Sequence, residues 1–164
     1  MNGFSLTDIF QMVDRAESSA AAFYRKAAKM QINLHESKKL SEMARMEDEH
    51  RAFFAEINRK LSGADKTAVQ DPSGEVRMYL NGLVERHGGE GSLEMAHELT
   101  GTESVEDIIG LAVTAEAQSI LFYVGLKDAF ALENDRKAVE KIIEEEKKHV
   151  VMLRGILEAH RQTL

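Results

Sequence analysis

The chain has 164 residues and a net charge of −7, which suits one folded domain but lacks the basic surface that general nucleic-acid binding requires. It contains no cysteine, so disulfides, thiolate zinc sites, iron–sulfur clusters and cysteine nucleophiles are excluded. Because the N-terminus shows no basic stretch followed by an apolar run, and no segment approaches the ~18 apolar residues of a membrane span, we expect a soluble, cytoplasmic protein with a single domain over residues 1–164.

Apolar residues recur at three- and four-residue spacing in four segments, which predicts four amphipathic helices. We expect them over about residues 5–31, 37–62, 104–132 and 134–162. Ser5 with Asp8, and Ser104 with Asp107, form start patterns whose side chains can cap free backbone amides.

A different stretch, residues 63–103, separates the second and third helices. It contains Pro72 and seven glycines, and short helices are expected within it at 76–80 and 93–99. The links inside each flanking pair are short, so each pair should form an antiparallel hairpin. The predicted fold is all-α: a four-helix bundle made of two antiparallel hairpins joined by a long crossover.

The second half of the chain repeats part of the first at a fixed offset of 99 residues (116 − 17). The offset relates four pairs of polar and aromatic residues: Glu17 and Glu116, Tyr24 and Tyr123, Glu47 and Glu146, and His50 and His149. Each half therefore carries a single Glu with a Tyr seven residues later, followed by E-x-x-H. No gap is needed to keep every pair in register.

The paired Glu and His residues interrupt apolar helix stripes, which predicts that they point into the core. An i, i+3 pair such as Glu47 and His50 projects from one face of a helix. Burying an unpaired carboxylate costs several kcal/mol, and two divalent ions would offset four ionised carboxylates. The pattern thus predicts a centre for two metal ions with six ligands: Glu17, Glu47, His50, Glu116, Glu146 and His149.

This arrangement resembles the ferritin-like di-iron carboxylate superfamily, in which two helices each supply one Glu and two supply Glu-x-x-His. Its E-x-x-x-x-x-x-Y and E-x-x-H pairs look most like the rubrerythrin-like branch. The resemblance implies that Glu47 and Glu146 bridge the metals, that the other two Glu are terminal ligands, and that each His binds one metal. It also leaves Tyr24 and Tyr123 either as hydrogen-bond donors to the ligand carboxylates or as plain core aromatics.

Three departures from related families limit what the resemblance implies. Without cysteine there is no rubredoxin-like iron domain, so electrons must come from another protein or from iron itself. Rubrerythrins have an extra carboxylate where this chain has Ser119, and the six-ligand set is closer to a bacterioferritin ferroxidase centre. Bacterioferritin's haem-binding Met is replaced by Asp48, so no haem is expected.

Acidic residues beside the E-x-x-H glutamates are not expected to be ligands, and the remaining histidines are interpreted as surface residues. Glu144 and Glu145 neighbour Glu146, but the repeat and the i, i+3 spacing both select Glu146 as the ligand. Four histidines have no partner at ligand spacing: His35, His87, His97 and His160.

The expected function is that of a redox enzyme whose Fe(II) pair, with manganese as the alternative metal, reduces peroxide or dioxygen. An external electron-donor protein and a homodimer or higher oligomer are implied, with neither nucleic acid nor membrane as a partner. Two alternatives stay open. One is a ferroxidase-type protein for iron storage or detoxification, and the other is a metal-stabilised helical interaction module without turnover.

Overall fold

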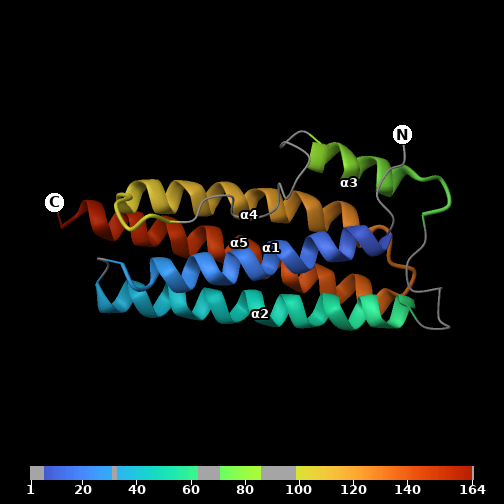
Figure 1. Cartoon of the computed structure of the whole chain (residues 1–164), viewed down its shortest axis with the longest axis horizontal. Coiled ribbons are helices and arrows are strands. Elements are labelled where there is room, and N and C mark those ends of the chain that lie inside the picture. Colours follow the sequence, from blue (N-terminus) through green and yellow to red (C-terminus); the bar gives the residue numbers. More distant parts are fainter. Residues whose placement is uncertain (1–5, 31–32, 63–70, 86–98, 164) are drawn as a thin grey trace.

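Four long helices lie side by side in the computed structural model, which describes residues 6–30, 33–62, 71–85 and 99–163 (Figure 1). They are α1 (Leu6–Ala27), α2 (Leu34–Ser62), α4 (Val105–Lys127) and α5 (Glu133–Arg161). A shorter helix, α3 (Glu75–Glu85), lies against α4. The described residues contain no strand, and the predicted all-α bundle is confirmed.

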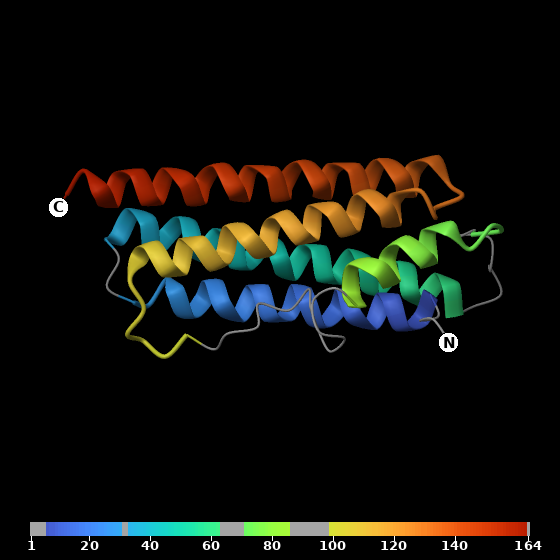
Figure 2. The ribbon, with the colours of Figure 1, turned by 90° about the horizontal axis from the view of Figure 1, so that it is seen from above.

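The bundle consists of two antiparallel hairpins. α1 packs mainly on α2, and α4 packs mainly on α5. Figures 1 and 2 show that α3 belongs to the connection between the two hairpins and lies near one end of the bundle. The short helix expected at 76–80 is present as the longer α3, whereas the one expected at 93–99 falls almost wholly outside the described residues.

Two helices end earlier than the apolar pattern predicted. α1 stops at Ala27, and the amides of Lys29 and Met30 bond to carbonyls three residues back rather than four. α4 stops at Lys127, and the amides of Ala129 and Phe130 do the same. These tight turns keep apolar side chains in the core after the helix has ended, so apolar spacing overestimates helix length.

Helix starts follow capping chemistry. α2 begins three residues earlier than predicted, and the side chain of Asn33 accepts the amide of Glu36 there. At α4 the predicted capping box is confirmed: Ser104 accepts the Asp107 amide, and Asp107 accepts the amide of Ser104. Ser5 of the other predicted cap lies outside the described residues.

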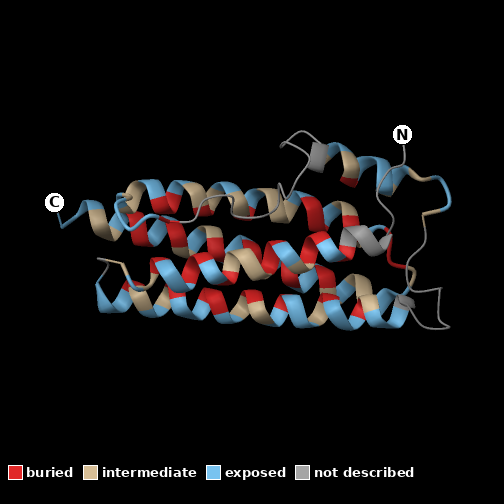
Figure 3. Ribbon diagram, in the orientation of Figure 1, coloured by how far each residue is buried: buried red, intermediate tan, exposed pale blue. Residues whose placement is uncertain are grey.

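Among the residues that the structure describes, the core consists of two apolar clusters, one toward each end of the bundle. Members of one 99-residue pair fall in opposite clusters, as Tyr24 and Tyr123 do, and as Ile57 and Ile156 do. Figure 3 shows the buried residues along the inner faces of the four long helices. The sequence repeat therefore corresponds to an approximate two-fold relation in space, which exchanges the two clusters.

α4 is the most apolar of the long helices. Among the described residues it is the one helix that could cross a membrane by length and composition, with a mean hydropathy of 1.5, so the expectation that no segment approaches a span is wrong by this measure. It carries the buried Glu116 and packs on α5. About one-third of that apolar window is buried, whereas Leu121 and Val124 of α4 are exposed, so core packing explains only part of its apolar character.

Candidate metal centre

The six predicted ligand residues come together in the middle of the bundle, between the two apolar clusters. Each is buried, with at most 3% of its surface exposed. α1 and α4 each supply one Glu, while α2 and α5 each supply the Glu and His of an E-x-x-H pair. The structure places all six side chains as the sequence predicted, each on the inner face of its helix.

The six residues form two overlapping groups of four. Glu17 and His50 belong to one group and Glu116 and His149 to the other, while Glu47 and Glu146 belong to both. Within each group, one potential ligand atom from every residue lies within 4.8 Å of the others. Two groups that share two carboxylates are what two neighbouring metal ions with two bridging ligands require.

Several polar atoms of the centre face one another without hydrogen bonds. His50 Nδ1 lies 2.9 Å from Glu146 Oε1, and His149 Nδ1 lies 3.0 Å from both Glu47 Oε1 and Glu146 Oε2. Among the described residues, neither Nδ1 atom nor these Oε atoms of Glu47 (Oε1) and Glu146 (Oε2) has a hydrogen-bond partner. Buried polar groups without partners are rare and costly. Cations bound between these lone pairs would satisfy them, so the residues fit a pair of metal ions.

Burial dominates the electrostatics of the two unshared carboxylates. It raises the pKa of Glu17 and of Glu116 well above the ordinary value, and the neighbouring carboxylates raise it further. Burial opposes the charged form of Glu146 too, but the imidazoles of His149 and His50, 3.0 and 2.9 Å from its oxygens, outweigh that effect and hold its pKa low. Burial likewise lowers the pKa of His149, yet the surrounding carboxylates raise it to about 12. Without metal, protons supply the positive charge that the centre needs.

The two tyrosines bond to ligand carboxylates across the bundle. Tyr24 of α1 donates its hydroxyl to Glu116 of α4, and Tyr123 of α4 donates to Glu17 of α1. Burial raises the pKa of the Tyr24 phenol, which keeps it protonated as a donor. The sequence left open whether the tyrosines are hydrogen-bond donors or plain core aromatics, and the structure contains the hydrogen bonds. Each tyrosine contacts the Glu of the other hairpin rather than the one on its own helix.

Glu145 touches the centre, which the sequence interpretation did not anticipate. Its Oε2 lies 3.0 Å from His50 Nε2, on the side of the ring that faces away from the ligand cluster. Glu144 is exposed and bonds to Lys147, away from the ligand cluster. The repeat could not identify Glu145, because the offset of 99 pairs it with Met46 (145 − 46) rather than with another acid.

A narrow opening leads to the carboxylates between α1 and α4. Four small side chains line it beside Glu17, Glu47 and Glu116: Ala16, Ala20, Ala115 and Ser119. These are again repeat pairs. The space available to the centre of a water-sized molecule is about 10 Å³, roughly the room for one water.

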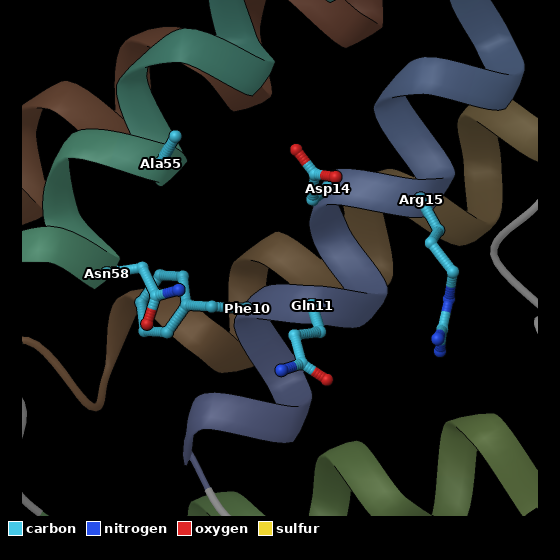
Figure 4. Close-up of a pocket in the computed structure, with 6 residues that line it drawn as sticks. All are labelled: Phe10, Gln11, Asp14, Arg15, Ala55 and Asn58. Carbon is cyan, nitrogen blue, oxygen red and sulfur yellow. The ribbon is translucent and has the colours of Figure 1, made fainter. Parts of the chain in front are cut away.

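A larger surface hollow, shown in Figure 4, lies between α1 and α2 and is unrelated to this centre. It is lined by Phe10, Gln11, Asp14, Arg15, Ala55 and Asn58. Asp14 is half-exposed and bonds to Arg51 over 2.7 Å, so its charge already has a partner. We assign no metal or catalytic chemistry to this hollow.

The remaining histidines stay away from the centre where they are described. His35 is exposed, and His160 lies 3.7 Å from Glu106 near the end of α5. The positions of His87 and His97 lie outside the described residues.

Comparisons with known proteins show the family and the fold of the chain. The family model described as Rubrerythrin matches residues 8–157. Among solved structures, the chain is similar to the crystal structure of a Thermotoga maritima protein that has been proposed to be a ferritin-like diiron-carboxylate protein. The TM-score is 0.66 at 20% identity, over 100% of this chain and 99% of that chain, which shows a shared fold. No curated protein matches.

Proposed function

Because the chain belongs to the rubrerythrin family, we propose that it is a non-haem di-iron protein that reduces peroxide or dioxygen. The observation that carries the proposal is the pair of buried four-residue groups that share Glu47 and Glu146. A set of carboxylates and imidazoles without thiolates suits iron, with manganese as the alternative. Two Fe(II) ions held by these residues would supply the two electrons that reduction of the oxidant needs. Two electrons and two protons convert hydrogen peroxide to two waters.

The residue roles follow from the grouping. Glu47 and Glu146 would bridge the two ions, because each belongs to both groups. Glu17 and Glu116 would each bind one ion, and the tyrosine hydroxyls would hold these carboxylates in place. His50 and His149 would complete the two positions, and their burial keeps bulk water away from both imidazoles.

The opening between α1 and α4 favours a small oxidant over a bulky organic substrate. Its four small side chains give access to the carboxylates but leave room for roughly one water. A peroxide or dioxygen molecule is of that scale, and a sugar or a fatty acid is not. We therefore expect reactivity toward small oxidants only.

Several further features of the proposal come from the sequence. With no cysteine for a second iron site, the electrons would come from an external donor protein. We propose no haem, a homodimer or higher oligomer, a cytoplasmic location, and no nucleic-acid or membrane partner. The bundle with its connecting segment would form one domain.

The direct test is anaerobic loading with Fe(II) followed by mixing with peroxide or with dioxygen. We expect two irons per chain and rapid, stoichiometric oxidation, which stopped-flow absorption would measure. Glu47→Ala and Glu146→Ala should each lose binding and oxidation, because each change removes a ligand from both positions. Glu144→Ala, which removes an exposed acid two residues from Glu146, is the control and should behave as wild type. Unchanged binding and oxidation in both bridging variants would sink the proposal.

One observation favours a second candidate, a ferroxidase-type iron-storage or detoxification protein. Ser119 follows Glu116 by one helical turn and lines the opening, where it supplies no additional carboxylate ligand. A six-ligand centre of this kind suits oxidation of Fe(II) as substrate. Particle mass in solution separates the two candidates: a large hollow assembly supports storage, and a dimer supports the oxidoreductase.

A further inference from the structure

The contacts of the centre come in pairs related by the 99-residue repeat. Tyr24 donates to Glu116, and Tyr123 donates to Glu17. The Nδ1 atoms of both histidines face the carboxylates shared by the two groups, at 2.9–3.4 Å for His50 and 3.0 Å for His149. A centre built only from these contacts would offer two equivalent metal positions.

One contact has no counterpart. His50 Nε2 lies 3.0 Å from Glu145 Oε2, which α5 brings to it across the bundle. At the equivalent position the repeat has Met46, whose thioether is only a weak acceptor. Nε2 of His149 is fully buried and has no hydrogen-bond partner within the described part of the chain.

The contact matters because of how an imidazole binds a metal. If His50 binds through Nδ1, its proton resides on Nε2, and Nε2 can donate it to Glu145. Such a bond fixes the tautomer and the orientation of the ring and makes the ligating nitrogen a better donor. Glu145 is about one-quarter exposed, at 23%, and its other oxygen lies 3.8 Å from Lys141 Nζ. Oε2 is therefore left to face His50.

We propose that Glu145 is a positioning residue that makes the two metal positions unequal, so that the position on the His50 side fills first and holds its ion more tightly. The inference rests on the proposed function in one respect, namely that the six buried residues bind two metal ions. Loss of a carboxylate or similar partner behind a ligating histidine typically weakens metal affinity about 10–100-fold. The two positions should differ by a factor of that order.

The test is an anaerobic titration of the metal-free protein with Co(II), in which calorimetry and the absorption of the bound ion measure each binding step. Wild type should bind two ions per chain in two resolved steps. Glu145→Leu should weaken the tighter step about 10–100-fold while both ions still bind. Glu145→Gln keeps an acceptor oxygen and should retain much of the difference. Met46→Glu places an acid on the His149 side and should tighten the weaker step.

A matched control removes the same charge from the same helix. Glu144→Leu changes an exposed neighbour whose carboxylate bonds to Lys147 on the same helix, and it should leave both steps unchanged. Circular dichroism of each metal-free variant checks that the bundle is intact. If Glu145→Leu does not fold, Glu145→Gln and Met46→Glu still report on each position separately.

Failure of this inference and failure of the proposed function look different. Two indistinguishable steps in wild type, an equal effect of Glu145→Leu on both steps, or an unchanged weaker step in Met46→Glu would overturn the inference while leaving the di-metal centre in place. Absence of metal binding in wild type would overturn both. Two unequal steps without any oxidation by peroxide or dioxygen would overturn the redox function alone.

Discussion

The six buried acids and imidazoles were predictable at the level of single residues because two independent signals agree on them. The repeat relates them in pairs, and each interrupts an apolar stripe. Burial is costly for such groups, so their presence in a core has to be explained by a partner. The metal-ligand roles themselves remain a proposal, whereas the convergence of the side chains is a feature of the structure.

Contacts beyond the ligands were less predictable. The sequence places Tyr24 two turns after Glu17, yet its hydroxyl reaches Glu116 on the opposite hairpin, which depends on how α1 and α4 face each other. The repeat and the i, i+3 spacing select Glu146 over its neighbour Glu145. A spacing rule for one helix carries no information about which neighbouring helix a side chain meets, and Glu145 reaches His50 on α2. Contacts between helices depend on packing that single-helix periodicity does not encode.

Metal binding should displace protons from the ligand residues. In the metal-free centre the pKa values of Glu17, Glu116 and His149 are raised, so these groups hold protons at pH values where free side chains would not. Ligands must lose their protons to bind metal, so binding should release protons and weaken as the pH falls. Calorimetry in buffers of different ionisation enthalpy should show release of more than one proton per ion near pH 7. A heat independent of the buffer would contradict this.

The same shifts fix the sign of the stability change with pH. A group whose folded pKa is raised stabilises the fold below its unfolded pKa, and this contribution is lost as the pH rises through the folded value. The raised pKa values of Glu17, Glu116 and His149 all act in this direction. The lowered pKa of Glu146 acts in the opposite direction, and its contribution to stability is fully present above the ordinary value of 4.5. The melting temperature of the metal-free protein should therefore fall between about pH 5 and pH 9, and that of the metal-loaded protein should not.

At the level of whole helices, element type was easier to predict than element length. The capping chemistry at Ser104 fixed the start of α4 to within one residue. The ends of α1 and α4 were overestimated because Met30 and Phe130 continue the apolar pattern in tight turns. The sequence predicted less than half the length of α3. Packing against α4 stabilises this helix, and that contact is not visible in the periodicity of its own sequence.

The packing of α3 on α4 should depend on the absence of a side chain at Gly125. An added Cβ at Gly125 would lie 2.2 Å from the Tyr79 ring, whose hydroxyl donates to the Leu121 carbonyl over 3.1 Å. Gly125→Ala should therefore displace Tyr79, with a loss of about 1–2 kcal/mol in the free energy of unfolding measured in urea. The Tyr79 ring should become more exposed to solvent, and acrylamide should therefore quench the tyrosine fluorescence of the variant more strongly.

Gly110→Ala on the same helix is the matched control. A Cβ there meets nothing within 4 Å, so only helix propensity changes, and the variant should be more stable by about 0.5–1 kcal/mol. Equal effects of the two substitutions would show that α3 does not depend on the close approach at Gly125.

At the scale of the whole molecule, the bundle is two apolar clusters with a charged layer between them. The two-fold relation follows from the sequence repeat, and the clusters exchange under it. The single-domain organisation stays a prediction. Without metal the charged layer is costly for the fold, because several of its buried atoms have no hydrogen-bond partner in the described part of the chain. We infer that the layer is kept for binding, at the expense of stability.

A variant whose layer is apolar should be more stable than the metal-free protein. Changing the six acids and histidines to leucine would leave the hydroxyls of Tyr24 and Tyr123 without acceptors, so both are changed to phenylalanine as well. Replacing buried ionic groups by apolar side chains of similar volume is often neutral or stabilising by about 1–4 kcal/mol. The variant should bind no metal, yet unfold at higher urea concentration than the metal-free wild type. Metal-loaded wild type should in turn gain stability as the free metal concentration rises above the dissociation constants. A variant less stable than the metal-free protein would mean that the protonated layer itself supports the fold.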